Sequence, residues 1–292
     1  MLRPFEIHEP RTVEEASVLL AQFGFDAAIY AGGTELLLIM KEGLAHFPHL
    51  VNIKTIPGLD EIALSIEGDE LQIGPLATHW ELERSPSVRK YAPLFAEVES
   101  QVANARVRAM GTIGGNLCFA EPHSDPATLL LAWGATLELS SADAQRQLPV
   151  ADFTLGMFET ARQPEEILTH IRLPLLSENT AGAYRKFSTH ERPMATVAAL
   201  LQVKDGIIED ARLAVGSVGP VPIRASKAEA LLEGQRAEEA AFASAAELAA
   251  SASDPIDDSH GSAEYKRHLV RVLTAQALEQ AAKRAAGDVD EG

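Results

Sequence analysis

Two glycine-centred runs, far apart in the chain, constrain its fold more than any other feature of the sequence. The first is Ala31-Gly32-Gly33-Thr34-Glu35-Leu36-Leu37 and the second is Gly111-Thr112-Ile113-Gly114-Gly115-Asn116-Leu117. A glycine pair lets backbone N–H groups turn toward an anion, because no Cβ blocks the approach and positive φ is accessible. One such turn is also typical of an ordinary strand-to-helix connection, but two together favour the two halves of one nucleotide site.

The residues around the first run predict a βαβ-like unit. Thr12 and Glu15 have the spacing of a capping box, and the apolar helix face that follows them ends at Gly24. Residues 27–31 and 50–53 are short apolar runs typical of buried strands. The first glycine run therefore joins a strand to a helix that contains residues 36–41.

The remainder of the chain predicts two more units and an α+β fold. Alternating apolar residues predict a hairpin over residues 62–73, and the later apolar segments predict a three-stranded antiparallel sheet followed by three helices. The three strands are expected near residues 184–187, 195–203 and 207–215, and the helices at residues 225–232, 237–250 and 262–285. We expect domains at residues 1–58, 59–176 and 177–292.

Composition excludes several classes of protein. The formal net charge of −17 over 292 residues argues against a nucleic-acid partner, which usually meets a basic face. The single cysteine, Cys118, excludes an internal disulfide and any iron–sulfur cluster held by this chain alone. The uncharged stretch at residues 126–137 is too short to span a membrane and the N-terminus does not open as a signal peptide, so a cytoplasmic location is expected.

Reactive thiols and metals are not expected either. Cys118 has apolar neighbours, which is typical of an inert core thiol. His46 and His49 are three residues apart, but no third ligand is near them in the sequence, and we predict no bound metal. If this chain handles electrons, other chains must hold the metals.

With their flanks, the two glycine runs resemble one family of flavoproteins along nearly the whole chain. The chain resembles the FAD-binding, or medium, subunit of molybdenum hydroxylases, the carbon monoxide dehydrogenase and xanthine dehydrogenase family. The matching pieces occur in the order Pro4-Phe5, Thr12-Val13-Glu14-Glu15-Ala16, the two glycine runs, Arg185-Lys186-Phe187, Pro222-Ile223-Arg224 and Ser262-Ala263-Glu264-Tyr265. The resemblance implies two α/β subdomains of a PCMH-type FAD-binding domain, followed by a C-terminal domain like that of carbon monoxide dehydrogenase flavoproteins.

The resemblance also implies FAD as cofactor and names the residues that contact it. It places the pyrophosphate against Ala31, Gly32, Gly33, Thr34, Glu35 and Leu36, with the Thr34 hydroxyl as an additional donor. Thr112, Gly115 and Asn116 would meet the cofactor from the other side. Asp125 matches an acidic position at the adenosine end, although an N-cap before Pro126 is an alternative role.

Three residues are implied at the flavin ring. Lys186 matches a lysine near the ring system, where a cation would stabilise the anionic reduced flavin and raise its potential. An exposed strand lysine is the alternative reading. Tyr184 is expected to cover one ring face, and Leu168, with Ile167, to line the pocket beside it.

The implied function is electron transfer within a larger enzyme. In the family, a molybdopterin-containing large subunit oxidises substrate, and a small subunit with two [2Fe–2S] clusters relays electrons to the FAD. The FAD then reduces an external acceptor such as NAD⁺, a quinone or O₂, so no catalytic acid or base is assigned to this chain. Two alternatives stay open: a stand-alone FAD-dependent oxidase or reductase, and a non-catalytic nucleotide-binding assembly protein.

Overall fold

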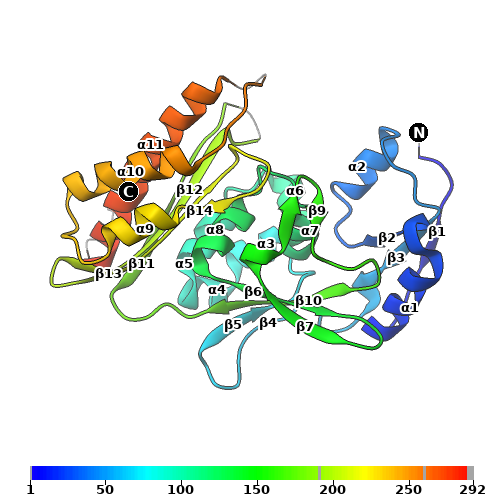
Figure 1. Cartoon of the computed structure of the whole chain (residues 1–292). Helices are drawn as coiled ribbons and strands as arrows, with labels where there is room; N and C mark the ends of the chain where they lie inside the picture. Colours follow the sequence, from blue (N-terminus) through cyan, green and yellow to red (C-terminus); the bar gives the residue numbers. More distant parts are fainter. Residues whose placement is uncertain (1, 190–191, 259–260, 288–292) are drawn as a thin grey trace.

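The computed structural model describes residues 2–189, 192–258 and 261–287, and within them three main sheets of three to five strands follow one another along the chain, with one small two-stranded sheet besides. Figure 1 shows a small N-terminal lobe, a central lobe of helices around the second sheet, and a C-terminal sheet with its own helices. Each of the three regions has its own cluster of buried apolar side chains. Among the described helices, none is both long enough and apolar enough to cross a membrane.

The N-terminal lobe is a three-stranded parallel sheet in the order β1-β3-β2. Its elements are β1 (Glu6–His8), α1 (Val13–Phe23), β2 (Ala27–Tyr30), α2 (Leu36–Lys41) and β3 (His49–Asn52), with short 3-10 turns at Gly24–Asp26 and Ile53–Thr55. Thr12 caps α1 by accepting the Glu15 N–H, whereas the Glu15 carboxylate accepts the N–H of Arg11. The predicted capping box is thus only half formed, and the strand-helix-strand order is confirmed.

The central lobe contains a five-stranded antiparallel sheet in the order β4-β5-β10-β6-β7. Its strands are β4 (Ile62–Leu64), β5 (Glu70–Ile73), β6 (Thr136–Ser140), β7 (Gln145–Pro149) and β10 (Ile167–Pro174), and a small separate hairpin consists of β8 (Thr154–Gly156) and β9 (Glu159–Thr160), after the 3-10 turn Val150–Asp152. The predicted hairpin over residues 62–73 is confirmed. Strand β10 lies in the middle of the sheet and pairs with β5 on one side and β6 on the other. It therefore joins the strands that precede the helices in the chain to those that follow them.

Six short helices pack beside this sheet between β5 and β6. They are α3 (His79–Arg84), α4 (Pro86–Tyr91), α5 (Pro93–Glu99), α6 (Ala105–Met110), α7 (Ile113–Phe119) and α8 (Asp125–Trp133). Helix α8 is buried along its whole length. The second glycine run forms the start of α7, which Thr112 caps.

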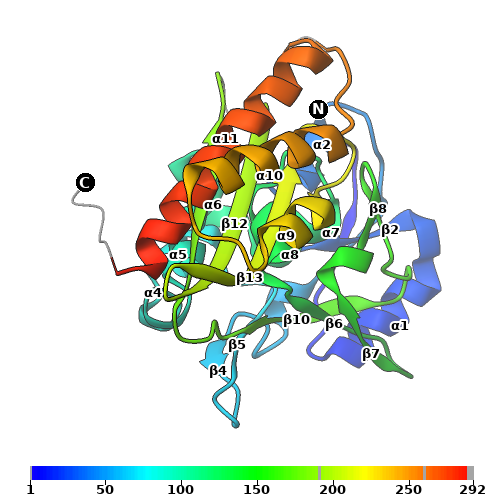
Figure 2. The same cartoon turned by 60° about the vertical axis from the view of Figure 1, so that its left-hand side comes forward.

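The C-terminal domain is an antiparallel sheet of β11 (Thr180–Phe187), β12 (Ala195–Lys204), β13 (Ile207–Gly216) and β14 (Ile223–Arg224). The three predicted strands are present, and the two-residue β14 adds a fourth that is too short to give a periodic signal. Helices α9 (Ser226–Leu232), α10 (Glu239–Ala252) and α11 (Ala263–Ala285) cover one face, as Figure 2 shows. Helix α8 packs against the same sheet from the central lobe, which joins the two regions.

A buried carboxylate, Glu138 on β6, ties together neighbouring strands of the central sheet. Its oxygens accept hydrogen bonds from Arg172 Nη2 at 2.6 Å and interact with His170 Nδ1 at 2.9 Å, both on β10. Arg172 also pairs with Glu70 on β5, so three adjacent strands share one ion network. Burial acts to raise the pKa of Glu138, but the hydrogen bonds from Arg172 and His170 prevail and lower it to about 2.

This lowered pKa predicts an acid-sensitive contribution to stability. The folded pKa of Glu138 lies below its value of 4.5 in an unpaired state, so its contribution is full above pH 4.5 and is lost as pH falls toward about 2. We expect Glu138→Gln to reduce the free energy of unfolding by up to about 3 kcal/mol at neutral pH. Urea unfolding of both proteins between pH 3 and pH 7 should show the difference shrinking in acid.

The matched control is Glu67→Gln, which changes an exposed carboxylate at the tip of the β4–β5 hairpin. That substitution should leave stability nearly unchanged at every pH. A Glu138→Gln deficit that is the same at pH 3.5 and pH 7 would contradict the assignment.

Candidate functional site

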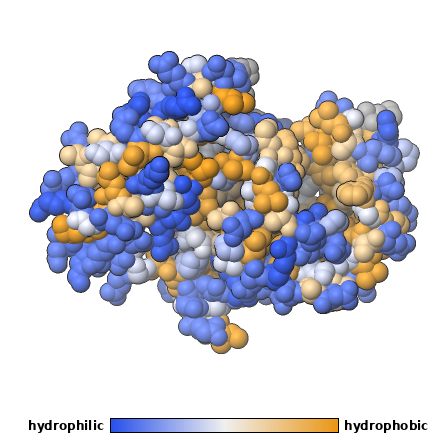
Figure 3. Space-filling model, viewed as in Figure 1, coloured by the Kyte–Doolittle hydropathy of each residue, from blue (hydrophilic) through white to orange (hydrophobic). Residues whose placement is uncertain are grey.

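A cleft of about 490 Å³ lies where the N-terminal lobe meets the central lobe. This volume is in the roughly 300–1,000 Å³ range of small-molecule sites. Eleven of the thirteen predicted site residues line it: Ala31, Gly32, Gly33, Thr34, Glu35, Leu36, Thr112, Gly115, Asn116, Asp125 and Leu168. In Figure 3 the surface is hollowed between the lobe at the right and the rest of the molecule, and apolar residues gather on both sides of the hollow.

The first glycine run forms the turn between β2 and α2. Gly33 has φ of +74°, a left-handed conformation that glycine adopts without strain. Gly32 faces the second run so closely that a Cβ there would lie 2.1 Å from the backbone oxygen of Met110. The two runs therefore touch through their backbones, and only glycine fits at this contact.

The second glycine run is held from the opposite side by the segment after β5. Gly114 donates its N–H to the Pro75 oxygen at 2.9 Å, and a Cβ on Gly114 would lie 2.4 Å from the Pro75 Cβ. Thr112 Oγ1 accepts the Gly115 N–H at 3.1 Å, as the N-cap of α7. A Cβ on Gly115 would approach only that Thr112 oxygen, so Gly115 leaves its side open to the cleft.

Lys54 holds the first run in place, and sequence reasoning missed it. Its Nζ donates to the Ala31 oxygen at 2.8 Å and lies 3.4 Å from the centre of the Tyr30 ring. Partial burial lowers its pKa. Lys54 lies in the 3-10 turn after β3, and a lysine in a short turn gives no sequence signal of such a contact.

Asp125, Tyr184 and Lys186 form one buried cluster at the wall of the cleft, and of the three Asp125 lines it. Asp125 accepts hydrogen bonds from Tyr184 Oη at 2.7 Å and Lys186 Nζ at 3.0 Å, and Lys186 also donates to the Gln101 oxygen at 2.7 Å. Burial raises the pKa of Asp125, and the Lys186 charge opposes that rise. Burial also raises the pKa of Tyr184, so the tyrosine stays a neutral donor.

Three expectations for this cluster need correction. Tyr184 does not line the cleft: its ring is buried in the central apolar core, and only its hydroxyl turns to Asp125. Ser124, rather than Asp125, caps α8, since its side chain accepts the Ala127 N–H. Lys186 is paired and largely buried, so the reading as an exposed strand lysine is wrong.

The short distance between Asp125 and Lys186 limits which part of FAD each of them could contact. Asp125 and Lys186 are 3.0 Å apart, whereas the adenosine and isoalloxazine ends of an extended FAD are separated by the whole pyrophosphate linker. The two residues therefore cannot serve opposite ends of an extended cofactor.

A buried pair, His79 and Glu99, lies next to this cluster and was not predicted. His79 Nδ1 and Glu99 Oε2 are 2.5 Å apart, and both side chains are almost fully buried. Burial raises the pKa of Glu99, and the charge of His79 opposes the rise. His79 lines the cleft and its backbone N–H binds the Gly111 oxygen, so the pair supports the start of the second glycine run.

Charged residues also gather at one side of the cleft. Glu121 Oε1 lies 2.7 Å from His123 Nδ1 and 3.3 Å from Arg192 Nη1. Burial raises the pKa of Glu35, and the charge of Arg192 partly offsets this effect. All four residues line the cleft, so both signs of charge face the same space.

Cys118 lines the cleft, is partly buried and packs against the central apolar core. Desolvation raises the pKa of its thiol to about 11, so the sulfur is protonated near neutral pH. The expectation of an unreactive thiol is consistent with that protonation.

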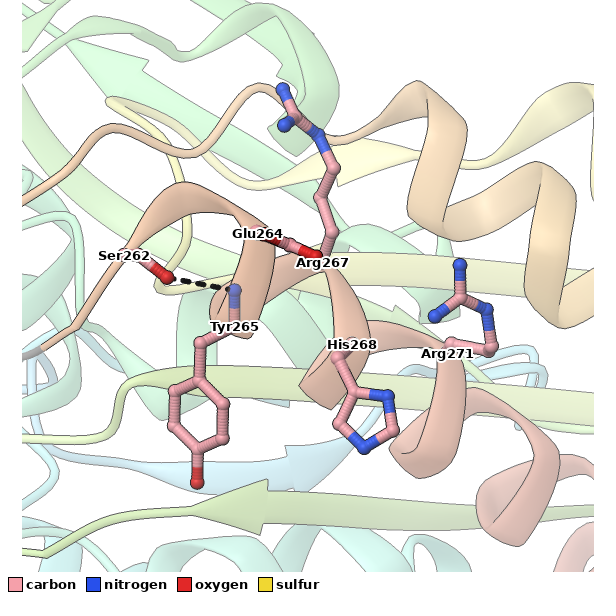
Figure 4. Close-up of a pocket in the computed structure, with 6 residues that line it drawn as sticks. All are labelled: Ser262, Glu264, Tyr265, Arg267, His268 and Arg271. Carbon is pink, nitrogen blue, oxygen red and sulfur yellow. Dashed lines mark hydrogen bonds between the residues drawn. The ribbon is translucent and has the colours of Figure 1, made fainter.

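A second hollow of about 480 Å³ follows the first turns of α11. Figure 4 shows Tyr265 and His268 pointing to the same side of the helix while Arg267 points away. Arg271 is paired with Glu247 of α10 at 2.5 Å. This open surface brings no set of buried polar groups to one point, and we assign it no ligand.

Comparison with known proteins shows which family the chain resembles. A family model described as the FAD binding domain in molybdopterin dehydrogenase matches residues 3–176, and one for the CO dehydrogenase flavoprotein C-terminal domain matches residues 183–281. The carbon monoxide dehydrogenase medium chain of Hydrogenophaga pseudoflava is 33% identical over 284 residues, covering 97% of this chain and 98% of that protein. The nicotine 6-hydroxylase medium subunit of Paenarthrobacter nicotinovorans is 32% identical, covering 94% and 96%.

A solved structure shows the same fold. Carbon monoxide dehydrogenase from Hydrogenophaga pseudoflava, in a form that lacks the Mo-pyranopterin moiety of its cofactor, superposes with a TM-score of 0.94 at 33% identity. The match covers 98% of this chain and 99% of that one. The likeness therefore extends over all three main sheets.

Gly32→Ala tests the backbone contact between the two glycine runs. The new Cβ would overlap the Met110 carbonyl, so the runs must move apart. We expect a loss of about 1–3 kcal/mol in the free energy of unfolding, as for other overpacked sites, measured by urea denaturation. Gly219→Ala is the control, because the nearest atom to its Cβ would be 3.6 Å away. Equal stability of the two variants would contradict the contact.

Proposed function

Since this chain belongs to the family of FAD-binding subunits of molybdenum hydroxylases, we propose that it carries electrons out of such an enzyme through its FAD. Partner chains would supply the rest: a large subunit with molybdopterin and a small subunit with [2Fe–2S] clusters. The acceptor would be NAD⁺, a quinone or O₂. The chain's own part is to bind the flavin, orient it and set its potential, because the redox chemistry belongs to the cofactor.

The main observation behind this proposal is that both glycine runs line the same cleft. A pyrophosphate needs N–H donors that converge from close range, and glycine backbones can supply them. The Gly114 and Gly115 N–H groups are already bonded to the Pro75 oxygen and to Thr112 Oγ1, so the donors would come mainly from the first run. The contact of Gly32 with the Met110 oxygen brings the two runs to one place, and Gly115 keeps the cleft open beside them. We therefore propose that residues 31–36 together with Thr112, Gly115 and Asn116 hold the pyrophosphate region.

We assign Asp125 and Lys186 together to the isoalloxazine end. The pyrimidine edge of a flavin presents an N–H donor between two carbonyl acceptors, and the Asp125 carboxylate could accept a hydrogen bond from that N–H. Asp125 lines the cleft and Lys186 lies behind it, so the lysine would act mainly by keeping Asp125 charged. Leu168 would pack beside the ring.

The proposed division into domains at residues 1–58, 59–176 and 177–292 follows the three sheets. The first two units would enclose the cofactor, and the third would cover its reactive end.

Cofactor release and one glycine substitution test the site. Denatured protein should release FAD and no FMN, identified by chromatography. Gly115→Val should weaken FAD binding by about tenfold or more, because its side chain would project into the open side of the cleft. Gly219→Val, remote from the cleft, is the control. Unchanged FAD affinity in a folded Gly115→Val protein would contradict the site.

Opposite shifts in flavin potential test the paired charges. Lys186→Gln removes a positive charge and should make the potential more negative by on the order of tens of millivolts. Asp125→Asn removes a negative charge and should shift it the other way. Lys204→Gln, at the β12–β13 turn, is the control. Spectroelectrochemical titration that moves both variants in the same direction would contradict the assignment.

The role in electron transfer requires the assembled enzyme. The complex would be purified through this chain from its native cells, and its substrates and acceptors screened. Flavin reduction should depend on the partner subunits, and the isolated chain should not turn over substrate. Substrate turnover by the isolated chain would replace the proposal with a stand-alone oxidase or reductase.

A further inference from the structure

Three metal-binding side chains meet on the N-terminal sheet, away from the cleft. Glu6 and His8 are two residues apart on β1, so they lie on the same face of the sheet. His49 on β3 pairs with Glu6 in the parallel register, which places its side chain beside theirs. The spacing of histidines along the chain could not reveal this cluster, because parallel pairing brings residues 6–8 and residue 49 together.

The donor atoms are close enough to share one ion. His8 Nε2 lies 3.0 Å from His49 Nδ1, and His49 Nδ1 lies 3.8 Å from Glu6 Oε2. One atom from each of the three residues lies within 4.8 Å of the other two. Tetrahedral zinc with bonds of about 2.0–2.1 Å places its ligands roughly 3.3 Å apart, so small side-chain rotations suffice.

The two imidazoles are held in place by an aromatic ring. Phe23, at the end of α1, stacks on His49 with ring centres 3.8 Å apart and on His8 at 4.9 Å. The hydrogen bond between the histidines requires a proton between two nitrogens. A metal ion can take the place of that proton without moving the rings far. Glu6, whose side chain is mostly exposed, can rotate to complete the set.

We propose that Glu6, His8 and His49 form a site for a divalent transition metal, with Zn²⁺ as its natural occupant. Two imidazoles and a carboxylate suit zinc, and three protein ligands leave a fourth position for water. The proposal departs from the expectation, based on sequence alone, that the chain binds no metal. The site would clip β1 to β3 and stabilise the N-terminal lobe.

The proposed site is separate from the FAD cleft. Ala27, which pairs with His49 at the start of β2, lines the cleft, but Glu6, His8 and His49 do not. The first glycine run follows Tyr30 at the other end of that strand. At a rise of about 3.3 Å per residue, the two ends of β2 are roughly 10 Å apart. Loss of the metal should therefore leave FAD binding unchanged, and the two proposals can fail independently.

Equilibrium dialysis against Zn²⁺ tests the site directly. The full-length chain, free of any affinity tag and with FAD bound, would be dialysed at pH 7.5 and its metal measured by mass spectrometry. We expect one Zn²⁺ per chain at micromolar concentrations and a higher Tm in its presence. His49→Gln and Glu6→Gln should each weaken binding by about tenfold or more. Glu6→Gln alters an exposed side chain, so it tests the site even if His49→Gln destabilises the lobe.

The control is His46→Gln, an exposed histidine nearby in the sequence that is not part of the cluster. It should bind Zn²⁺ like the unaltered protein, and all variants should keep their FAD. Equal Zn²⁺ affinity in the unaltered chain and in Glu6→Gln, or no binding at micromolar Zn²⁺, would overturn the proposal. Either result would leave a hydrogen-bonded histidine pair stacked on Phe23.

Discussion

The close contact of Gly32 with the Met110 carbonyl is the constraint on which the candidate site depends. It joins a turn of the parallel N-terminal sheet to the end of α6, in a part of the chain built around a different sheet. No side chain larger than hydrogen fits there, so the approach of the two lobes is fixed by backbone atoms. The second run is held in turn against Pro75, so backbone contacts set the positions of both runs at the cleft.

Two buried ion pairs, Lys186–Asp125 and His79–Glu99, also hold the elements around the cleft together. Asp125 and Glu99 are both desolvated, and burial alone would favour their neutral forms. Lys186 and His79 oppose this, and each comes from an element outside the one that carries its partner. Because removing one member would leave a buried charge unpaired, these pairs also fix how β11 sits against α8 and how α3 sits against α5.

The sequence predicted most elements of the fold because their signals are local. Periodicity and turn residues predicted the β4–β5 hairpin, the turn at Lys204 to Gly206 and the three C-terminal helices. The basic helix α6 and the two-residue β14 were missed, because neither has an apolar repeat long enough to detect. Eleven of the thirteen candidate residues, which were named by resemblance to a family, line the cleft, and their contacts with FAD stay a prediction.

The parts of the site that could not be predicted depend on contacts between distant segments. His79 meets Glu99, Lys54 meets Ala31, and Tyr184 turns its hydroxyl to Asp125 while its ring enters the core. Each residue looks ordinary within its own segment. Tyr184 is the clearest example of what the sequence could not predict. Resemblance placed this residue near the site, but only its packing in the core shows that its hydroxyl supports Asp125.

A protein with a formal charge of −17 can still hold an anionic cofactor, because distant charges are screened. At physiological ionic strength the Debye length is about 8 Å, so exposed carboxylates beyond the cleft contribute little to its potential. The local groups matter more: Arg162 and Arg192 line the cleft together with Glu35, Glu121 and Asp125, and Lys54 binds the first glycine run. Backbone N–H groups add attraction without net charge. Binding of a pyrophosphate is therefore decided by the few groups within one Debye length, and the acidic composition, which argued against nucleic acid, places no limit on it.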